Sequence, residues 1–536
     1  MKNIAQTQSF TDLIDFGYIY IDKTEQIFNL LKNRRAFISR PRRFGKSLML
    51  DTVGTLFESG VEPYFKGTWI YDKWTERKYP VLRLNFLKYT SEYDDFKRLF
   101  SKDIEYFANK LGIGEKITPN SKPDELMFDL LKALNELNLK TVILIDEYDT
   151  QLTANINNPE LYEKFRKEIR NLYGIMKGDP CIRFLGVTGV TRLKDVSVFS
   201  AGSDILDVSY ASEVAKITGF TREDLKKYYI DYINLAVSLD KGIREEQVTA
   251  EQREELLDRL AEEYNGYCFD ETHRIKVYST WSINCFFMNA YKKGYVVFGD
   301  YWYDNGGMPS ILERYLETHK IRLENYANDI DVKMNDFWNP SSLLNMRQEV
   351  LMCQTGYLTV KSTVPDGGSV TVGIPDNEVR RSFEKLLSQN IFATADFSKT
   401  RNEKLFSEAT PEDIVGKLNK LFNTISYEDF KKIDEKIIQG YLHAYMAGSD
   451  QPVQTEVQSA TGRSDIILEY SKRRLVLELK YAETEAECEK KLSEAVEQIK
   501  NRNYGETLPE KPVLKLALVF NGDSKVRQFT HYETVE

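Results

Sequence analysis

The chain has 536 residues, of which 42% are hydrophobic and 29% charged, and its formal net charge is -9. This length exceeds a single core, so we expect about three or four domains, and the acidic balance argues against a broadly basic surface while leaving room for a local basic groove. The sequence contains no apolar run long enough for a membrane span and no apolar core of a secretion signal, and its five cysteines form no C-x-x-C pair. We therefore expect a cytoplasmic protein that does not enter the membrane.

The first chemical motif is a strand, a loop and a helix near the N-terminus. Ala36–Ser39 forms a short apolar strand, the loop ends in Gly45-Lys46-Ser47, and a helix opens at Leu48. This is the context of a phosphate-binding loop, in which Gly45 and neighbouring backbone N–H groups surround the phosphates, Lys46 reaches the β/γ-phosphates and Ser47 holds Mg²⁺. Arg40 stands where the general motif has its first glycine. Arg43 is a candidate nucleotide contact, with contact to a second subunit or a surface salt bridge as alternatives.

An apolar run with two acids at its end follows about a hundred residues later. Thr141–Glu147 reads as a buried parallel strand, preceded by a helix from Pro123 to Leu139. Next to a phosphate loop, Asp146 is expected to coordinate Mg²⁺ and Glu147 to polarise the attacking water. The alternative is a core strand with ordinary solvated acids at its tip.

A third strand, Ile182–Arg192, ends in polar residues. Thr188 or Thr191 is expected to sense the γ-phosphate. Arg192 could stabilise transition-state charge, although a helix cap or a salt bridge explains it equally well. Strands alternating with helices from Ala36 to about Val208 predict a doubly wound, mostly parallel sheet.

These segments resemble the AAA-ATPase-like family of prokaryotic proteins. The resemblance rests on Phe10–Ile14, Tyr20–Thr24, Ser39–Ser47, Val187–Val190, Tyr264–Tyr267 and Gln354–Thr359. The family's own loop has Arg-Pro-Arg-Arg ahead of Phe-Gly-Lys-Ser, so Arg40 agrees with it. The resemblance implies a P-loop NTPase domain over residues 1–220, with ATP and Mg²⁺ as its ligands.

The middle of the chain indicates architecture more than chemistry. Thr221 caps a helix, and we expect a helical lid over residues 221–345. Its aromatic cluster reads as packing between lid and ATPase core, with a base-stacking platform as the sharper alternative: Trp281, Phe286, Phe287, Tyr301, Trp302 and Tyr303. Residues 346–425 contain an Asp-Gly-Gly hairpin and are either winged-helix-like or a simple bridge.

Near the C-terminus, two apolar strands carry a second set of charged residues. Asp465 opens the strand that runs to Tyr470, and Glu478 and Lys480 lie two residues apart on the next, so these two point to one face. Two carboxylates beside an ammonium suit a divalent cation and phosphodiester hydrolysis. The alternative is the exposed face of an amphipathic strand. Lys472-Arg473-Arg474 reads as a solvated turn between the strands, with phosphate contact as a minority interpretation.

This region resembles the PD-(D/E)XK nuclease superfamily, in particular its RecB-like branch. The resemblance implies an α/β nuclease domain over residues 426–536, with Asp465 and Glu478 as metal ligands and Lys480 as the catalytic lysine. It also implies Glu456 as an accessory acid, and Gln498 and Tyr504 as substrate contacts. The AAA-ATPase-like family often carries such a domain at its C-terminus, which is the order found here.

We therefore expect an ATP-binding protein that acts as an ATPase and is coupled to a nuclease that uses Mg²⁺, or else Mn²⁺. DNA is a more probable substrate than RNA, defence against mobile genetic elements is a hypothesis from the domain pairing, and a homo-oligomer is possible. One alternative is a nucleotide-dependent switch whose nuclease-like domain binds nucleic acid or a protein partner without efficient cleavage. Another is a nuclease whose NTPase domain serves only assembly.

Overall fold

The computed structural model describes residues 1–193, 204–302, 310–316, 319, 329–340, 342–343, 346–364, 368–391, 399–425, 433–448, 453–455, 465–470, 472–501 and 511–535. The chain forms two compact units. Unit 1 comprises Met1–Thr318 and Asp329–Arg380, and unit 2 comprises His319–Asn328 and Arg381–Glu536. The finer division into four segments stays a prediction.

Unit 1 is built on a five-stranded parallel sheet in the order β2-β3-β4-β1-β5. Alternate side chains of its strands enter the cores on opposite faces: Ala36 and Ile38 pack with helix α3, whereas Phe37 contacts Tyr148. The predicted doubly wound α/β fold is confirmed. The strands are β1 (Arg35–Ser39), β2 (Val81–Asn85), β3 (Thr141–Asp146), β4 (Ile182–Gly189) and β5 (Leu206–Asp207).

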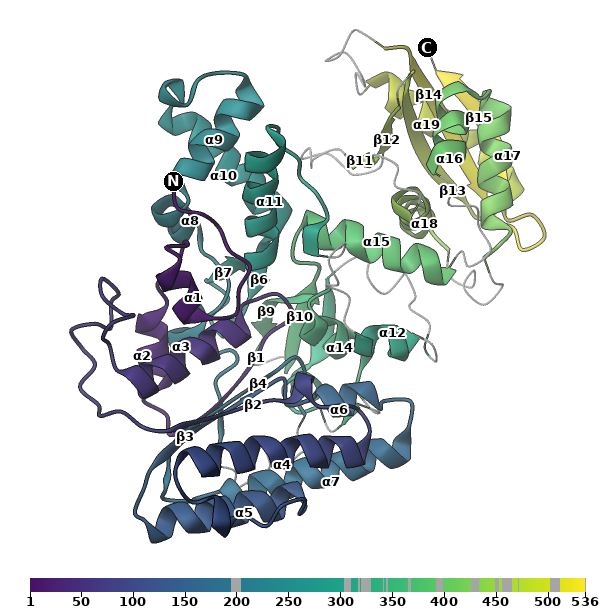
Figure 1. Ribbon diagram of the computed structural model, residues 1–536. Coiled ribbons are helices and arrows are strands. Elements are labelled where there is room, and N and C mark those ends of the chain that lie inside the picture. The colour runs from purple at the N-terminus through teal and green to yellow at the C-terminus, as the bar shows by residue number, and fades with distance from the viewer. Residues whose placement is uncertain are drawn as a thin grey trace. The chain divides into compact units, whose positions relative to one another are not determined.

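Helices cover both faces of this sheet (Figure 1). One group lies with the phosphate-loop helix: α1 (Phe10–Asp15), α2 (Thr24–Leu30) and α3 (Lys46–Ser59). The other group comprises α4 (Tyr93–Lys110), α5 (Pro123–Glu136), α6 (Thr150–Ala154) and α7 (Pro159–Met176). Pro123 opens α5, where its missing N–H has no intrahelical acceptor to lose.

The rest of unit 1 is less helical than predicted. It holds α8 (Arg222–Tyr228), α9 (Ile230–Lys241), α10 (Ala250–Tyr264), α11 (Thr280–Lys293), α12 (Ser310–Leu316), α13 (Met334–Trp338) and α14 (Gln348–Thr355). Strands interrupt the helices of the predicted lid at two places, the hairpin β6 (Asn265–Cys268) with β7 (Lys276–Tyr278), and β8 (Ile330–Lys333). Asp270 stabilises the hairpin turn by accepting hydrogen bonds from the backbone N–H groups of Thr272 (3.1 Å), Arg274 (3.0 Å) and Ile275 (3.1 Å).

The predicted Asp-Gly-Gly hairpin is present as β9 (Thr359–Val364) and β10 (Ser369–Gly373), and β8 joins it in the order β8-β10-β9. These strands belong to unit 1, whereas α16 (Lys399–Glu408) and α17 (Pro411–Phe422) belong to unit 2. The predicted bridging region is thus divided between the units. Helix α15 (Asn377–Ile391) contains the boundary itself, between Arg380 and Arg381.

Unit 2 contains a mixed five-stranded sheet in the order β11-β12-β13-β14-β15, in which only β13 and β14 are parallel. Its elements are α18 (Glu435–Gly448), β11 (Val453–Thr455), β12 (Asp465–Glu469), β13 (Arg474–Ala482), α19 (Glu485–Asn501), β14 (Val513–Asn521) and β15 (Gln528–Val535). Apolar side chains of β12, β13 and β14, namely Ile467, Val476 and Ala517, pack with Ala495 and Ile499 of α19. This α/β arrangement confirms the predicted nuclease-type fold.

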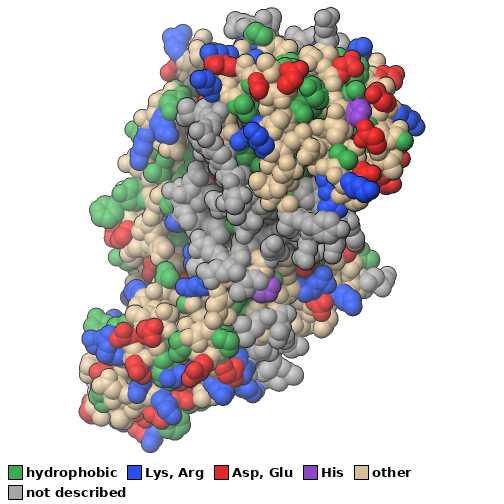
Figure 2. Space-filling view, turned by 90° about the vertical axis from the view of Figure 1, so that its right-hand side faces the viewer, with side chains coloured by type: hydrophobic (Ala, Val, Ile, Leu, Met, Phe, Trp, Pro, Cys, Tyr) green, Lys and Arg blue, Asp and Glu red, His purple; other side chains and the backbone are tan. Residues whose placement is uncertain are grey.

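The apolarity of the helices and the charge on the surface both bear on function. Among the described helices, none is both long and apolar enough to cross a bilayer. On the face displayed in Figure 2, basic side chains are interspersed with acidic ones, which is the pattern expected of a chain with a net charge of -9.

Candidate functional sites

The loop between β1 and α3 has the geometry of a phosphate-binding loop. Gly45, at the N-cap of α3, has φ +86°, a left-handed conformation that glycine adopts without strain. The Lys46 side chain is 4% exposed, and its Nζ donates to the carbonyl oxygens of Arg40 (3.1 Å) and Pro41 (3.2 Å). The lysine is therefore folded over the loop with its charged end beside the backbone that would surround a phosphate.

Three predicted residues meet at the carboxyl ends of neighbouring strands. Asp146 ends β3, and its two carboxylate oxygens accept hydrogen bonds from Ser47 Oγ (2.6 Å) and Thr188 Oγ1 (2.5 Å). Asp146 and Ser47 supply oxygen ligands, the chemistry that Mg²⁺ prefers. Thr188 bonds the carboxylate itself, so its predicted contact with a γ-phosphate would require that bond to open.

Glu147 faces the loop lysine. Its Oε1 lies 3.3 Å from Lys46 Nζ, and its backbone has φ +54°, an uncommon left-handed value for a non-glycine residue. Such local strain is frequent at functional positions. A nucleotide that draws Lys46 toward its phosphates would release the Glu147 carboxylate to accept a proton from water.

Sequence reasoning missed Asp149, which fixes the segment after β4. Its side chain is 1% exposed and accepts from the N–H (2.7 Å) and Oγ1 (2.6 Å) of Thr191. Burial raises the pKa of Asp149, the nearby Glu147 raises it further, and the Thr191 hydrogen bonds oppose both. The signal was present as a third acid in the run Asp146–Asp149.

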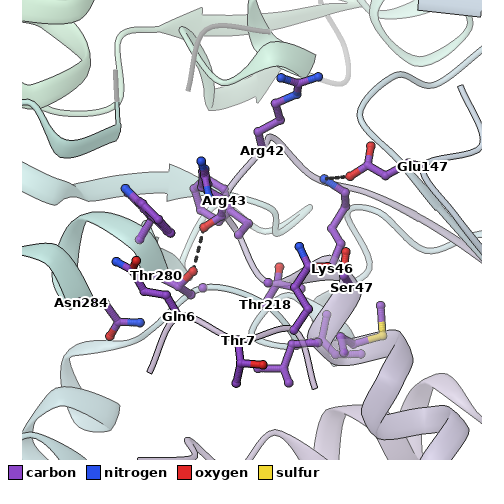
Figure 3. A pocket seen from close by; sticks show the side chains of 18 of the residues that line it. Gln6, Thr7, Arg42, Arg43, Lys46, Ser47, Glu147, Thr218, Thr280 and Asn284 are labelled. Atoms are coloured by element: carbon purple, nitrogen blue, oxygen red, sulfur yellow. Dashed lines mark hydrogen bonds and ion pairs between the residues drawn. The ribbon is translucent and has the colours of Figure 1, made fainter. Parts of the chain in front are cut away.

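A cavity of about 540 Å³ extends from the phosphate loop. Figure 3 shows Lys46, Ser47 and Glu147 on one side of it, and Gln6, Asn284 and Thr280 on the other. Its wall combines the N-terminal segment, the loop, the residues around Thr218 and helix α11. A volume of this size suits a nucleotide, with the phosphates at Lys46 and the base among the apolar and amide groups.

The arginines of the loop and of β4 have different surroundings. Arg40 is 1% exposed and donates to Thr218 Oγ1 (3.1 Å) and to the carbonyl oxygens of Ser39 (2.8 Å) and Ser209 (2.6 Å). Arg43 lies 3.9 Å over the Trp281 ring, at the cavity wall. Arg192 is paired with Asp207 (2.6 Å), which agrees with the salt-bridge alternative for this residue.

In unit 2, the sheet register brings the predicted acids together. Asp465 on β12 is directly opposite Glu478 on β13 in the antiparallel pairing, so the register brings these two positions together. Lys480 lies two residues beyond Glu478 on the same face, and its Nζ is 3.3 Å from Glu478 Oε1. The Glu478 side chain is 0% exposed and that of Lys480 is 9% exposed. The structure thus places Glu478 beside Lys480 and pairs Asp465 with Glu478 by register, while the role of these three residues as one catalytic site stays a prediction.

Another acid joins Lys480 that the sequence did not single out. Glu435, the first residue of α18, places Oε1 3.1 Å from Lys480 Nζ. An acid in the first turn of a helix is common, so the sequence contained no specific signal for it. Gln498, on α19, has a buried Oε1 without a hydrogen-bond partner in the described part of the chain. Glu456 and Tyr504 lie outside the described residues, as does Tyr303.

The predicted aromatic cluster and basic turn have structural contacts. Phe286 and Phe287 lie in a core formed mainly by α8 to α11, so they pack within the predicted lid rather than chiefly between lid and ATPase core. Arg473 caps the end of α16 by donating to the carbonyl oxygens of Phe406 (2.8 Å) and Ala409 (2.9 Å), so the turn before β13 is not simply solvated. Over the described residues, no three His, Cys, Asp or Glu side chains form a metal-binding group.

Comparisons with known proteins match both regions. Residues 5–199 match the family described as predicted AAA-ATPase, and residues 433–530 match the PD-(D/E)XK nuclease superfamily. A relative from Azotobacter chroococcum mcd 1, an uncharacterized protein in the vnfD 5' region, is 25% identical over 525 residues, 95% of this chain and 94% of the relative. The crystal structure of Cdc6p from Pyrobaculum aerophilum is 11% identical with a TM-score of 0.21, covering 69% of this chain and 92% of that one, a likeness too small to support an argument.

Proposed function

Because the chain joins a predicted AAA-ATPase domain to a PD-(D/E)XK nuclease superfamily domain, we propose that it binds and hydrolyses ATP and that nucleotide controls a metal-dependent nuclease in unit 2. The nuclease acts on nucleic acid, DNA in preference to RNA. The observation that carries most weight is the pairing of Asp465 with Glu478 across β12 and β13, with the Lys480 ammonium 3.3 Å from Glu478.

Different residues of unit 1 bind the phosphates, hold the metal ion and activate water for ATP hydrolysis. Lys46 binds the β- and γ-phosphates, and Ser47 with Asp146 fits a Mg²⁺ ion, because both offer oxygen ligands and a hydrogen bond holds them side by side. Glu147 orients the attacking water and accepts its proton, while the bond from the γ-phosphorus to the bridging oxygen breaks. Mg²⁺ supplies charge neutralisation when bound.

Residues of unit 2 fit phosphodiester hydrolysis. Asp465 and Glu478 are hard oxygen donors for Mg²⁺ or Mn²⁺, which would polarise the phosphate when bound. Lys480 orients the attacking water or stabilises the charge that develops on the phosphate oxygens. To reach the water or the phosphate oxygens, the Lys480 ammonium must leave Glu435 or Glu478. Substrate binding therefore rearranges the ion pairs of Lys480.

The test is cleavage of DNA and RNA by the full chain in Mg²⁺, with Lys480→Ala as the variant. We expect cleavage to fall by about 10²–10⁴-fold while ATP hydrolysis is retained. The matched control is Lys420→Ala, an exposed lysine on α17 of the same unit, which should cleave normally. Equal cleavage by Lys480→Ala and Lys420→Ala would exclude the assigned nuclease site.

A second function is favoured by the double ion pair of Lys480 with Glu435 and Glu478. A lysine held this way suits a domain that binds nucleic acid or a partner without efficient cleavage, under the control of nucleotide. Absence of cleavage with every DNA and RNA tested, together with nucleotide-dependent binding, would support this switch. A role in defence against mobile genetic elements would be contradicted if cells with and without the gene resisted phage and plasmids equally.

A further inference from the structure

The backbone of the phosphate loop is held by residues far along the chain. The carbonyl oxygen of Arg42 accepts from the indole Nε1 of Trp302 (3.4 Å), and that of Arg43 accepts from Thr280 Oγ1 (2.7 Å). Figure 3 shows the Thr280 contact beside the cavity. A shift of these carbonyl groups when phosphates bind would therefore alter the hydrogen bonds from Thr280 and Trp302.

Trp302 is fully buried, and it connects the loop to a helix in a different part of unit 1. Its ring lies 5.2 Å from that of Tyr357, and its backbone N–H donates to Glu378 Oε1 (2.8 Å). The neighbouring Gly356 has φ +96°, and a Cβ on it would lie 2.8 Å from Pro41 Cβ, too close for any side chain. The packing around Trp302 is thus tight enough to transmit small displacements.

Glu378 receives a second bond from the same region. Its Oε2 accepts from Ser282 Oγ (2.7 Å), two residues beyond Thr280, which contacts the loop. The side chain is 1% exposed, and burial raises the pKa of Glu378 well above its ordinary value of 4.5. One buried carboxyl group therefore joins both segments that contact the loop carbonyl groups.

Glu378 is the second residue of α15, and this helix runs through the boundary into unit 2. We propose that Trp302 and Glu378 are positioning residues that transmit the state of the phosphate loop to α15, and through it to the nuclease-superfamily unit. The proposal rests on the nucleotide-binding function given above. Nucleotide acts by favouring one arrangement of the loop over another, and α15 follows because it shares hydrogen bonds with the residues that contact that loop.

The test is hydrogen exchange on the full chain, with and without the non-hydrolysable ATP analogue AMP-PNP and Mg²⁺. In the unaltered protein we expect about tenfold slower exchange both in the loop, residues 40–47, and in α15, residues 379–386. Trp302→Phe removes the indole N–H but keeps the backbone bond to Glu378. It should bind AMP-PNP with affinity within about threefold of normal and show reduced protection in α15 alone, because the contact of Thr280 with the loop is kept.

Two pairs of variants separate coupling from a merely structural role. Glu378→Ala should lose protection of α15, whereas Glu378→Gln, which can still accept from Trp302 and pair with Ser282, should retain it. Trp338→Phe, a half-buried tryptophan elsewhere in unit 1, should respond like the unaltered protein. If Glu378→Ala fails to fold, the protection of α15 in Trp302→Phe is the readout that tests the coupling.

Slower exchange in α15 that is undiminished in Trp302→Phe would overturn the proposal, as would protection of the loop without protection of α15 in the unaltered protein. Absence of protection at residues 40–47 in the unaltered protein would instead contradict nucleotide binding, and the coupling with it. The two readouts therefore distinguish failure of the link from failure of the proposed function.

Discussion

Arg40 stands at the position of the first glycine of a general phosphate loop, and its side chain is buried against partners outside that loop. The guanidinium lies 4.2 Å over Phe269 and bonds Thr218 and Ser209, so it connects the end of β1 to these three later segments. Burial lowers the pKa of Arg40 to about 10, which leaves it charged at pH 7. The departure from the general motif is structural and leaves Lys46 and Ser47 in their expected places.

Restoring the glycine should consequently weaken the protein. Arg40→Gly loses three hydrogen bonds from a charged donor and the contact with Phe269, so we expect the free energy of unfolding of unit 1 to fall by about 3 kcal/mol. Urea unfolding of the full chain measures this, with the exposed Arg98→Ala on α4 as control. Unchanged stability would show that the buried guanidinium does not hold this region together.

Glu147 gives a second prediction at this scale. Glu147→Gln removes the proton acceptor and also the ion pair with Lys46, so hydrolysis should fall by about 10²–10⁴-fold while ATP binding stays normal or tightens. Steady-state hydrolysis and equilibrium binding of ATP measure the two effects separately. Loss of binding together with hydrolysis would mean that Glu147 is needed to place Lys46, and would contradict its role as base.

The sequence was informative about residues wherever a motif fixed their spacing. Lys46, Ser47 and Asp146 were predicted because a phosphate loop and an acid-tipped parallel strand are recognisable patterns, and the structure places Ser47 against Asp146. Glu435 was not predictable, because the contact with Lys480 joins residues 45 apart that no local pattern connects.

At the scale of elements, hydrophobic alternation predicted the strands of unit 2 correctly. The helical pattern of residues 221–345 did not reveal the strands that interrupt it. The register that places Asp465 opposite Glu478 follows from two alternating strands joined by a short turn. The hairpin β6–β7 was missed because its stabilising bonds, from backbone N–H groups to Asp270, arise from a turn inside a mostly helical segment. Gly266 within it packs on Pro375, whose carbonyl oxygen would lie 2.1 Å from an added Cβ.

The first turn of α15 gives a pH prediction. The raised pKa of Glu378 means that the folded protein binds its proton more tightly than the unfolded chain does, so the free energy of unfolding falls as pH rises above 4.5 toward the raised value. Glu378→Gln removes this titration, and its stability relative to the unaltered protein should therefore improve from pH 5 to pH 8. Urea unfolding at the two pH values is the measurement. If the two proteins differ in free energy of unfolding by the same amount at pH 5 and pH 8, the account is contradicted.

The molecule as a whole consists of two units that share a continuous helix. Composition predicted several domains, and the motifs predicted an ATPase-type and a nuclease-type unit in the correct order. What the sequence could not predict is that α15 begins within the contacts of unit 1 and continues into unit 2, because burial of Glu378 against Ser282 and Trp302 depends on packing between distant segments.

The central claim is that nucleotide bound at Lys46 controls cleavage at Lys480. The most direct measurement is the initial rate of Mg²⁺-dependent DNA cleavage by the full chain with and without ATP, in the unaltered protein, Lys46→Ala and the control Lys110→Ala, an exposed lysine on α4. We predict that ATP changes the rate in the unaltered protein and in Lys110→Ala but not in Lys46→Ala. Equal rates with and without ATP in the unaltered protein, or the same response to ATP in Lys46→Ala, would contradict it.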